Sequence, residues 1–303
     1  MVNARKIGVV TASRAERGLL EPVIKRIESH PRLTCSLLEI KPDWGMSFIF
    51  TCVSIWLDRE KPDIVLIPCD RKEQVPVALV CLSKNVPIAH FYSGSSIGGN
   101  IQDEIYGMII ALCSHVHLCH DENAAEILKK IGIEEWRIKV VGSTAFDDVT
   151  LDYSLVPNEP FDLVLINPDT ISKERTERDI EEALSKLWRR AVIIGPNEDE
   201  NREIILKKIQ EFIRKKKIVC NFYDSVPREQ FLALLKECRH FITNSSSAFY
   251  EAPYFSTTCI LIGERNKFRR VPSRIVTGAS DRIVDILANI KIDEKLLRKR
   301  LKL

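Results

Sequence analysis

Short apolar runs rich in β-branched residues alternate along the chain with longer amphipathic ones. Strand-like runs lie at 6–10, 63–68, 86–91, 116–119 and 138–142, with helical stretches at 15–29, 73–84, 102–113 and 121–131. After a break bounded by prolines at 154–162, strand-like runs resume at 162–166, 191–195, 218–222, 240–244 and 257–263, again separated by helices. Strands alternating with helices of this length predict parallel sheets joined by right-handed crossovers.

Two such series joined by one break predict the domain organisation. The fold class expected is α/β, with two Rossmann-like domains facing each other across a cleft. The boundary is placed so that residues 1–150 form the N-terminal domain and residues 151–303 the C-terminal one. The last helix is allowed to pack back on the N-terminal domain.

Composition narrows the class of protein. The 303 residues are 45% apolar and 29% charged, which is typical of a globular protein. A net charge of +3 is too small to argue for a nucleic-acid partner, and no run approaches the length needed to span a bilayer. The N-terminus lacks the pattern of a signal peptide. Nine cysteines without paired spacing favour reduced thiols in a cytoplasmic protein.

The segment "CSHVHLCH" at 113–120 raises the question of a metal. Cys113, His115, His117 and Cys119 alternate, so on a strand they would share a face and could bind zinc. The run continues an apolar pattern, however, and buried cysteines behave as small hydrophobic residues. No second ligand cluster accompanies it, so we expect no metal. His90, within an apolar strand, is interpreted in the same way as a core histidine.

Polar residues follow the predicted strands of both halves. In open α/β sheets, ligands bind beyond the carboxyl ends of the strands. These loops contain Arg14, Asp70, Arg71, Glu73, Asp103, Glu104 and residues 167–170, 196–199, 223–227, 245–247 and 264–270. Each loop alone is explained by ordinary turns or caps: Asp70 suits a turn, and Asp103 and Glu104 suit the first turn of a helix. Together they predict a site for a phosphorylated ligand.

The stretch "FITNSSSAFYEAP" at 241–253 is the most informative of these loops. Serines favour helix N-caps, and three in a row place hydroxyls beside the unpaired amides of a helix N-terminus. Such a place suits an anion, although an ordinary cap also explains it. Ser247 and Glu251 are four residues apart, so they lie on one face of the helix.

These blocks resemble the UDP-N-acetylglucosamine 2-epimerase family, especially the hydrolysing type of sialic acid pathways. The similarity covers nearly the whole chain. It is carried by "TASRAERGLLEPVIKRI", "PDIVLIPCDRKEQVPVAL", "VPIAHFYSGSSIGGNIQDEI" and, most closely, "FITNSSSAFYEAPYFSTTCILIGERNKFR".

The resemblance implies roles for particular residues. Arg14 and Arg269 contact the nucleotide diphosphate, Ser245, Ser246 and Ser247 hold the pyrophosphate, and Glu251 binds the ribose hydroxyls. The N-terminal domain then carries the catalytic acids, with Asp70 and Asp103 as the acid and base and Glu104 in reserve. The C-terminal domain binds UDP.

The reaction implied removes the C2 proton of the sugar while UDP leaves C1. Water or UDP then adds, giving N-acetylmannosamine and UDP or the epimeric UDP-sugar. This chemistry requires no metal and no cofactor. The resemblance also suggests a homodimer.

Several positions depart from the family pattern. Ser95 or Ser96 replaces an acid, Tyr92 a histidine, and Asn167 another histidine. Gly107 and Met108 replace an arginine and a histidine. Serine cannot serve as a carboxylate base, and asparagine cannot carry a proton as histidine does, so Ser95, Ser96 and Asn167 are assigned to substrate binding. The segment 40–62 is also shorter than its counterpart in the family.

Two alternatives stay open. A degenerate member would bind the nucleotide-sugar without turning it over, which fits the loss of an acid, an arginine and a histidine. A glycosyltransferase would use the same cleft, but no acceptor site is identifiable.

Overall fold

The chain folds as two compact units. The computed structural model describes residues 4–41, 43–95, 101–169, 172–215, 218–267, 269 and 276–302. Unit 1 comprises residues 1–148 and 272–303, and unit 2 comprises residues 149–271. The chain therefore returns to unit 1 after completing unit 2. Each unit holds one parallel sheet, which confirms the predicted pair of Rossmann-like folds. The functional roles assigned to the two predicted domains stay predictions.

Unit 1 is built on a six-stranded parallel sheet with the order β2-β1-β3-β4-β5-β6. The strands are β1 (Arg5–Thr11), β2 (Leu33–Glu39), β3 (Ile64–Pro68), β4 (Ile88–Phe91), β5 (Val116–Cys119) and β6 (Ile138–Val140). Its helices are α1 (Arg14–Ser29), α2 (Met46–Glu60), α3 (Gln74–Ser83), α4 (Ile101–Cys113), α5 (Glu122–Lys130), α11 (Ala279–Asn289) and α12 (Glu294–Leu297), with short 3-10 turns at Glu135–Arg137 and Thr144–Phe146.

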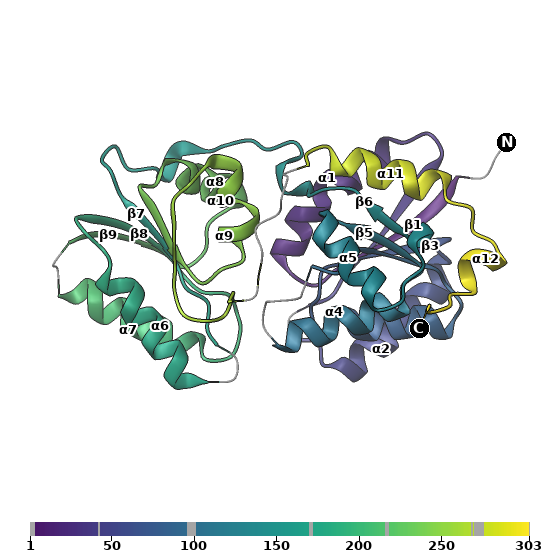
Figure 1. Ribbon diagram of the computed structural model, residues 1–303, viewed down its shortest axis with the longest axis horizontal. Coiled ribbons are helices and arrows are strands. Elements are labelled where there is room, and N and C mark those ends of the chain that lie inside the picture. Colours follow the sequence, from purple (N-terminus) through teal and green to yellow (C-terminus); the bar gives the residue numbers. More distant parts are fainter. Residues whose placement is uncertain are drawn as a thin grey trace. The chain divides into compact units, whose positions relative to one another are not determined.

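Two helical layers cover this sheet. α1 and α11 pack on one face and α2, α3 and α4 on the other (Figure 1). β3 shows how the strands serve both layers. Leu66 enters the core under α1 and α11, whereas Val65 and Ile67 enter the core under α2 and α3. The strands of the sheet centre are therefore mostly apolar, as a sheet buried on both faces requires, with His90 on β4 and His117 on β5 as buried polar exceptions.

The segment between the first two predicted strands contains a strand and a helix that the sequence pattern did not predict. The sequence pattern indicated no strand or helix between residues 30 and 62, where the structure has β2 and α2. β2 is an edge strand whose side chains are mostly half-buried, so it lacks a clear alternation. α2 combines β-branched and aromatic residues and lacks a charged face, so the helical period is hidden.

The C-terminal segment is fixed within unit 1 by two cations, the buried Arg137 and the half-buried Lys299. Arg137 is 1% exposed, donates to the carbonyls of His115 (3.1 Å) and Leu296 (2.8 Å), and pairs with Glu134 at 2.7 Å. Lys299 Nζ donates to three carbonyls at the end of α4. Burial lowers the Lys299 pKa to about 7. These contacts hold α12 against the sheet.

Unit 2 has a five-stranded parallel sheet with the order β11-β10-β7-β8-β9. The strands are β7 (Asp162–Leu165), β8 (Arg190–Ile194), β9 (Val219–Tyr223), β10 (His240–Thr243) and β11 (Cys259–Leu261). The helices are α6 (Lys173–Ser185), α7 (Arg202–Arg214), α8 (Arg228–Glu237), α9 (Ser247–Tyr250) and α10 (Ala252–Phe255), with a 3-10 turn at Tyr153–Leu155. α6 and α7 cover one face of the sheet, and α8 to α10 cover the other (Figure 1). Within the described ranges of both units, no helix has the length and apolar character needed to cross a membrane.

Candidate functional site

Asparagine side chains join the strand-end loops of unit 2. Asn167 follows β7, Asn197 follows β8, Asn244 follows β10 and Asn266 follows β11. Asn244 Oδ1 accepts from the Asn167 amide at 2.7 Å, and Asn244 Nδ2 donates to the Asn167 carbonyl at 2.8 Å. Asn266 Nδ2 donates to the Asn244 carbonyl at 2.5 Å. Because Asn244 and Asn266 are buried, these bonds satisfy backbone groups that water cannot reach.

Asn167, predicted to bind substrate, takes part in this network. Its Oδ1 accepts from the Asn197 amide at 3.1 Å, so the oxygen of the side chain already has a structural partner. The position where the family carries a histidine is therefore a fixed neutral amide at the carboxyl end of β7. An amide held in this way can orient a ligand, but it cannot transfer a proton.

The three serines of the run are not equivalent. Ser245 is buried; its amide donates to Thr243 Oγ1 at 2.9 Å, and its Oγ accepts from the Ser247 amide at 3.3 Å. Ser246 is exposed and makes no capping bond through its side chain. A helix does begin at Ser247, but α9 is only four residues long, so its dipole adds little at this place. What the loop offers an anion is hydroxyls and local amides.

Glu251 and Arg269 lie beside the serine run. The Glu251 amide donates to the Ser247 carbonyl at 3.0 Å, so these two residues are one helical turn apart, as predicted. Arg228 Nη1 donates to Glu251 Oε1 at 3.0 Å, which fixes a carboxylate that is only 13% exposed. Arg269 Nη1 donates to the Tyr250 hydroxyl at 2.7 Å.

Arg269 also connects to the asparagine network, because its Nε donates to Asn266 Oδ1 at 3.1 Å. The serine run, Glu251 and Arg269 are thus brought together at one edge of unit 2. Arg228, which begins α8 after β9, is a further residue of this site that the sequence pattern did not predict. Its place in a strand-end loop was the available signal.

In unit 1, a buried carboxyl group joins two strand-end loops. Glu16 is 2% exposed, and its Oε2 accepts from the Ala12 amide at 2.6 Å and from Gln74 Nε2 at 3.2 Å. Burial raises the Glu16 pKa to about 7, although the Ala12 amide and the Arg71 charge oppose the shift. Sequence analysis missed Glu16. The signal was the spacing Ser13–Glu16 of a capping box, and the Glu16 amide does donate to Ser13 Oγ at 3.2 Å.

Asp70 is half-buried and directly follows β3. The preceding Cys69 has a left-handed backbone (φ 56°). Its amide donates to the Phe91 carbonyl at 2.8 Å, and its carbonyl lies 2.6 Å from His90 Nε2. The turn that presents Asp70 is therefore tied to β4. Arg71, next along the chain, pairs with the buried Glu73 at 3.1 Å.

The other predicted residues of unit 1 occupy the loop after β4 and the start of α4. Asp103 and Glu104 are half-buried in the first turn of α4, on the same edge of the sheet as Asp70. Ser95 Oγ donates to the Tyr92 carbonyl at 2.5 Å, which closes its own turn. Ser96 lies outside the described residues, as does the side chain of Arg14, whose backbone begins α1.

The histidine and cysteine cluster is part of the core. His117 and Cys119 lie on β5, but Cys113 ends α4 and His115 precedes the strand, so the four do not share one strand face. His115 Nδ1 accepts from the Ile88 amide at 3.1 Å, and His117 Nδ1 lies 3.0 Å from Ser93 Oγ. Burial lowers the pKa of His115 to about 4 and that of His117 well below its usual value. In the described part of the chain, no three His, Cys, Asp or Glu side chains are grouped as metal ligands would be.

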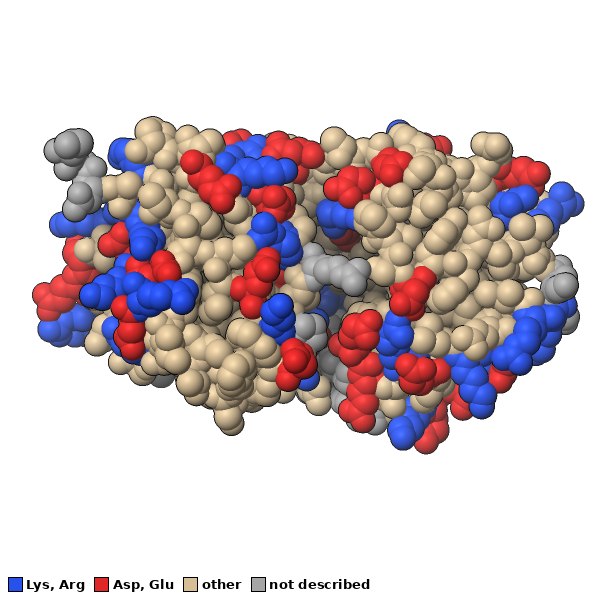
Figure 2. Space-filling view, turned by 180° about the vertical axis from the view of Figure 1, so that it is seen from behind, with Lys and Arg blue, Asp and Glu red and all other residues tan. Residues whose placement is uncertain are grey.

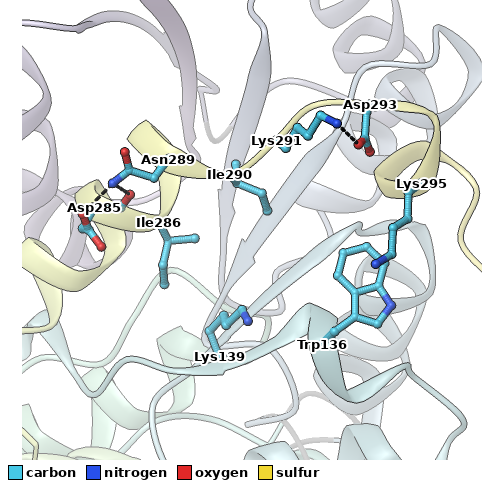
Figure 3. Close-up of a pocket in the computed structure, with 9 residues that line it drawn as sticks. All are labelled: Trp136, Lys139, Asp285, Ile286, Asn289, Ile290, Lys291, Asp293 and Lys295. Carbon is cyan, nitrogen blue, oxygen red and sulfur yellow. Dashed lines mark hydrogen bonds and ion pairs between the residues drawn. The ribbon is translucent and has the colours of Figure 1, made fainter.

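A shallow cavity of about 580 Å³ lies elsewhere in unit 1, between α11, α12 and the start of β6 (Figure 3). Trp136, Lys139, Asp285 and Lys295 are among its lining residues. Trp136 precedes β6, so this cavity lies at the amino end of that strand, away from the carboxyl ends that carry the candidate site. It does not contain any predicted site residue.

Known structures define the class of fold. A UDP-GlcNAc 2-epimerase from Neisseria meningitidis, solved with UDP-GlcNAc, aligns with a TM-score of 0.76 over 93% of this chain and 99% of its own, at 15% identity. A lipopolysaccharide outer core galactosyltransferase aligns with a TM-score of 0.51 over 97% and 93% of the two chains, also at 15% identity. The fold is therefore α/β and glycosyltransferase-B-like, with two parallel sheets.

The sequence then identifies the family. The family model described as UDP-N-acetylglucosamine 2-epimerase matches residues 42–302, so the chain belongs to this enzyme family. A relative from Campylobacter jejuni, described as a GDP/UDP-N,N'-diacetylbacillosamine 2-epimerase (hydrolyzing), is 28% identical over 91% of this chain and 84% of its own. The resemblance drawn from the sequence blocks is confirmed.

Proposed function

We propose that this protein binds a UDP-sugar and eliminates UDP from it with inversion at C2, as a UDP-N-acetylglucosamine 2-epimerase. The observation that carries the proposal is the match of the family model to residues 42–302, across both units. Within that match, acids lie at the strand ends of unit 1, and hydroxyls and amides lie at those of unit 2. A metal or cofactor is not part of the proposal.

The nucleotide is assigned to unit 2. Ser246 and Ser247, with the local amides, contact the diphosphate, and Arg269 and Arg14 neutralise its charge. Glu251 accepts the ribose hydroxyls, held in place by Arg228 at 3.0 Å. Ser245 acts mainly through its bonds to Thr243 and Ser247, because it is buried beneath the other two.

Proton transfer is assigned to unit 1, since a base must accept the C2 proton as the bond between C1 and the diphosphate oxygen breaks. Asp70 is the first candidate, because it is half-buried at the end of β3 on a turn that β4 fixes. Asp103 is the second and Glu104 the reserve. Ser95 and Asn167 already bond to the backbone, so they position the sugar and carry no proton.

The substrate is UDP-N-acetylglucosamine or a UDP-sugar with a second acetamido group. The hydrolysing relative acts on a diacetylbacillosamine nucleotide, which supports including that class. The products are the free C2-inverted sugar and UDP, or the epimeric UDP-sugar. The scattered cysteines support a cytoplasmic location, and the family resemblance supports a homodimer.

The test incubates the purified chain with each UDP-sugar in deuterium oxide. UDP release is followed, and the product is examined by NMR for configuration and for deuterium at C2. We expect deuterium at C2 of an inverted product, because the abstracted proton exchanges with solvent. Binding of UDP without any product would instead show a degenerate binding protein. Failure to bind UDP, measured by calorimetry, would overturn the proposal.

A further inference from the structure

A carboxyl group buried in unit 1 has hydrogen-bond partners in two different strand-end segments. Acidic side chains are spread over the surfaces of both units (Figure 2), whereas Glu16 of α1 is only 2% exposed. Its Oε2 accepts from the Ala12 amide, in the loop after β1, at 2.6 Å. Gln74 is fully buried and donates from Nε2 to both carboxylate oxygens, at 3.2 and 3.3 Å. Burial of an ionisable group costs stability, and such groups concentrate at functional sites.

Gln74 stands at the end of the loop that carries Asp70. This loop connects β3 to α3 and is five residues long. At its beginning, the Cys69 amide donates to the Phe91 carbonyl at 2.8 Å. At its end, Gln74 is the first residue of α3 and is held by Glu16. Because so short a loop is fixed at both ends, the position of Asp70 depends on both anchors.

The loop after β1 has anchors that do not involve Gln74. Ser13 caps α1: its Oγ accepts from the Glu16 amide at 3.2 Å, and its carbonyl accepts from the Arg17 amide at 2.9 Å. The hydrogen bonds between Glu16 and Gln74, called here the Glu16–Gln74 link, therefore fasten the loop after β3 to a helix start that is already fixed.

The charges around the link come from the loop after β3. Burial raises the pKa of Glu16 to about 7, with the Arg71 charge opposing the shift and the Glu73 charge adding to it. Above pH 7 Glu16 is mainly a carboxylate, which accepts from Ala12 and Gln74 together. The Oε1 atom of Gln74 is buried and has no hydrogen-bond partner among the described residues. That oxygen can accept from a donor placed at position 16.

We propose that Glu16 is a positioning residue that, through Gln74, fixes Asp70 for removal of a proton from the sugar. This inference rests on the proposed function, in which Asp70 is the first candidate for the base. A base must lie within hydrogen-bond reach of the proton that it accepts, and a displacement of about 1 Å lowers a rate roughly 100-fold. The contribution of Glu16 is therefore to the geometry of the site.

Direct proton transfer by Glu16 is a poorer explanation of the same contacts. Both carboxylate oxygens already accept from protein donors, and the side chain is 2% exposed, so neither oxygen can approach C2 of a bound sugar. A hydrogen bond that serves stability alone is the other alternative. Direct transfer requires a carboxylate at position 16, and a purely structural bond predicts a loss of stability without a change in kcat.

The test separates the link from the charge, using the UDP-sugar that wild type converts, at pH 8. Gln74→Met is similar in volume and removes the donor, so kcat should fall roughly 100-fold, while KM and the dissociation constant of UDP change less than about 3-fold. Glu16→Gln retains the link, because its oxygen accepts from Ala12 and its Nε2 donates to Gln74 Oε1. Its kcat should stay within about 3-fold of wild type. Glu21→Gln, at the exposed side of α1, is the matched control and should turn over normally.

The outcomes distinguish the alternatives. Circular dichroism and thermal unfolding establish that each variant is folded, and Glu16→Met breaks the link from the other side if Gln74→Met is unfolded. Unchanged kcat in a folded variant without the link would overturn the proposal, because the bond would then be structural only. So would a loss of activity in Glu16→Gln as large as in Gln74→Met, which would show that the charge matters. A wild type that releases no UDP contradicts the proposed function itself, and the positioning role with it.

Discussion

The strand-end loops of the two units carry different chemistry. In unit 1 they hold carboxyl groups: Glu16 is buried between two loops, and Asp70 and Asp103 are half-buried. In unit 2 they hold amides and hydroxyls, of which Asn244 and Ser245 are buried, beside an ion-paired glutamate and an arginine. Proton transfer needs groups that change charge near the working pH, whereas holding an anion needs donors that keep their protons, as amides, hydroxyls and guanidinium groups do. Under the proposed function, one fold serves two tasks through the residues placed at its strand ends.

The largest expected effect concerns stability at acid pH, where unit 1 should unfold before unit 2. Burial lowers the pKa of His90 and His115 from 6.5 to about 4, and that of His117 well below 6.5. All three lie in unit 1. Between pH 6.5 and 4 the unfolded chain therefore binds more protons than the folded one, and stability falls as pH falls. For His90 and His115 the loss by pH 4 is roughly 6 kcal/mol, and His117 adds to it.

Hydrogen exchange followed by mass spectrometry over this pH range would detect the loss. β4 and β5 of unit 1 should lose protection before β7 and β8 of unit 2. His117→Gln should flatten the pH dependence, whereas His30→Gln, at the end of α1, should leave it unchanged. Simultaneous loss of protection in both sheets would contradict the comparison.

Replacing the first acid candidate tests the catalytic side of the comparison. Asp70→Asn keeps the shape of the side chain and removes its ability to accept a proton, so kcat should fall by roughly 10³-fold. Binding of UDP, measured by calorimetry, should persist. Asp58→Asn, an exposed residue of α2, is the matched control and should turn over normally. An unchanged rate in Asp70→Asn would move the assignment to Asp103.

Replacing Asn244 tests the role in UDP binding that is proposed for unit 2. Asn244→Ala leaves the half-buried Asn167 amide and carbonyl without the partners they have at 2.7 and 2.8 Å. The free energy of unfolding should drop by about 2–3 kcal/mol, and the affinity for UDP should fall with it. Urea denaturation gives the first quantity and calorimetry the second. Asn289→Ala, on the exposed surface of α11, should change neither.

The last expected effect, similar in size to that of Asn244→Ala, concerns Glu16. Its folded pKa is raised from 4.5 to about 7, so the folded state binds more protons than the unfolded one between these values. Wild-type stability should therefore lose a contribution, about 3 kcal/mol at most, as pH rises from 4.5 to 7. Glu16→Gln should remove this contribution and be relatively more stable at pH 8 than at pH 5. Urea unfolding at the two pH values measures the difference, and equal shifts at both would contradict the buried carboxyl.

Much of the fold followed from local pattern. The run at 116–119 coincides with β5, and the helical stretch at 15–29 differs from α1 by one residue. Apolar runs recur because a strand that is buried on both faces needs apolar side chains at consecutive positions, and such a run is visible in the sequence. α2 was not predicted because its outer face is also apolar, so the sequence lacks the alternation of apolar and polar positions by which an amphipathic helix is recognised.

The sequence by itself determined the two parallel sheets, the loops that carry polar residues and the family to which the chain belongs. Only the tertiary structure decided which of those polar groups already have hydrogen-bond partners within the protein. The Asn167 oxygen is bound by an amide thirty residues away, and Glu16 is enclosed by Gln74 from another loop. Hydrogen-bond partners and desolvation come from segments far apart in the chain, so no local pattern records them.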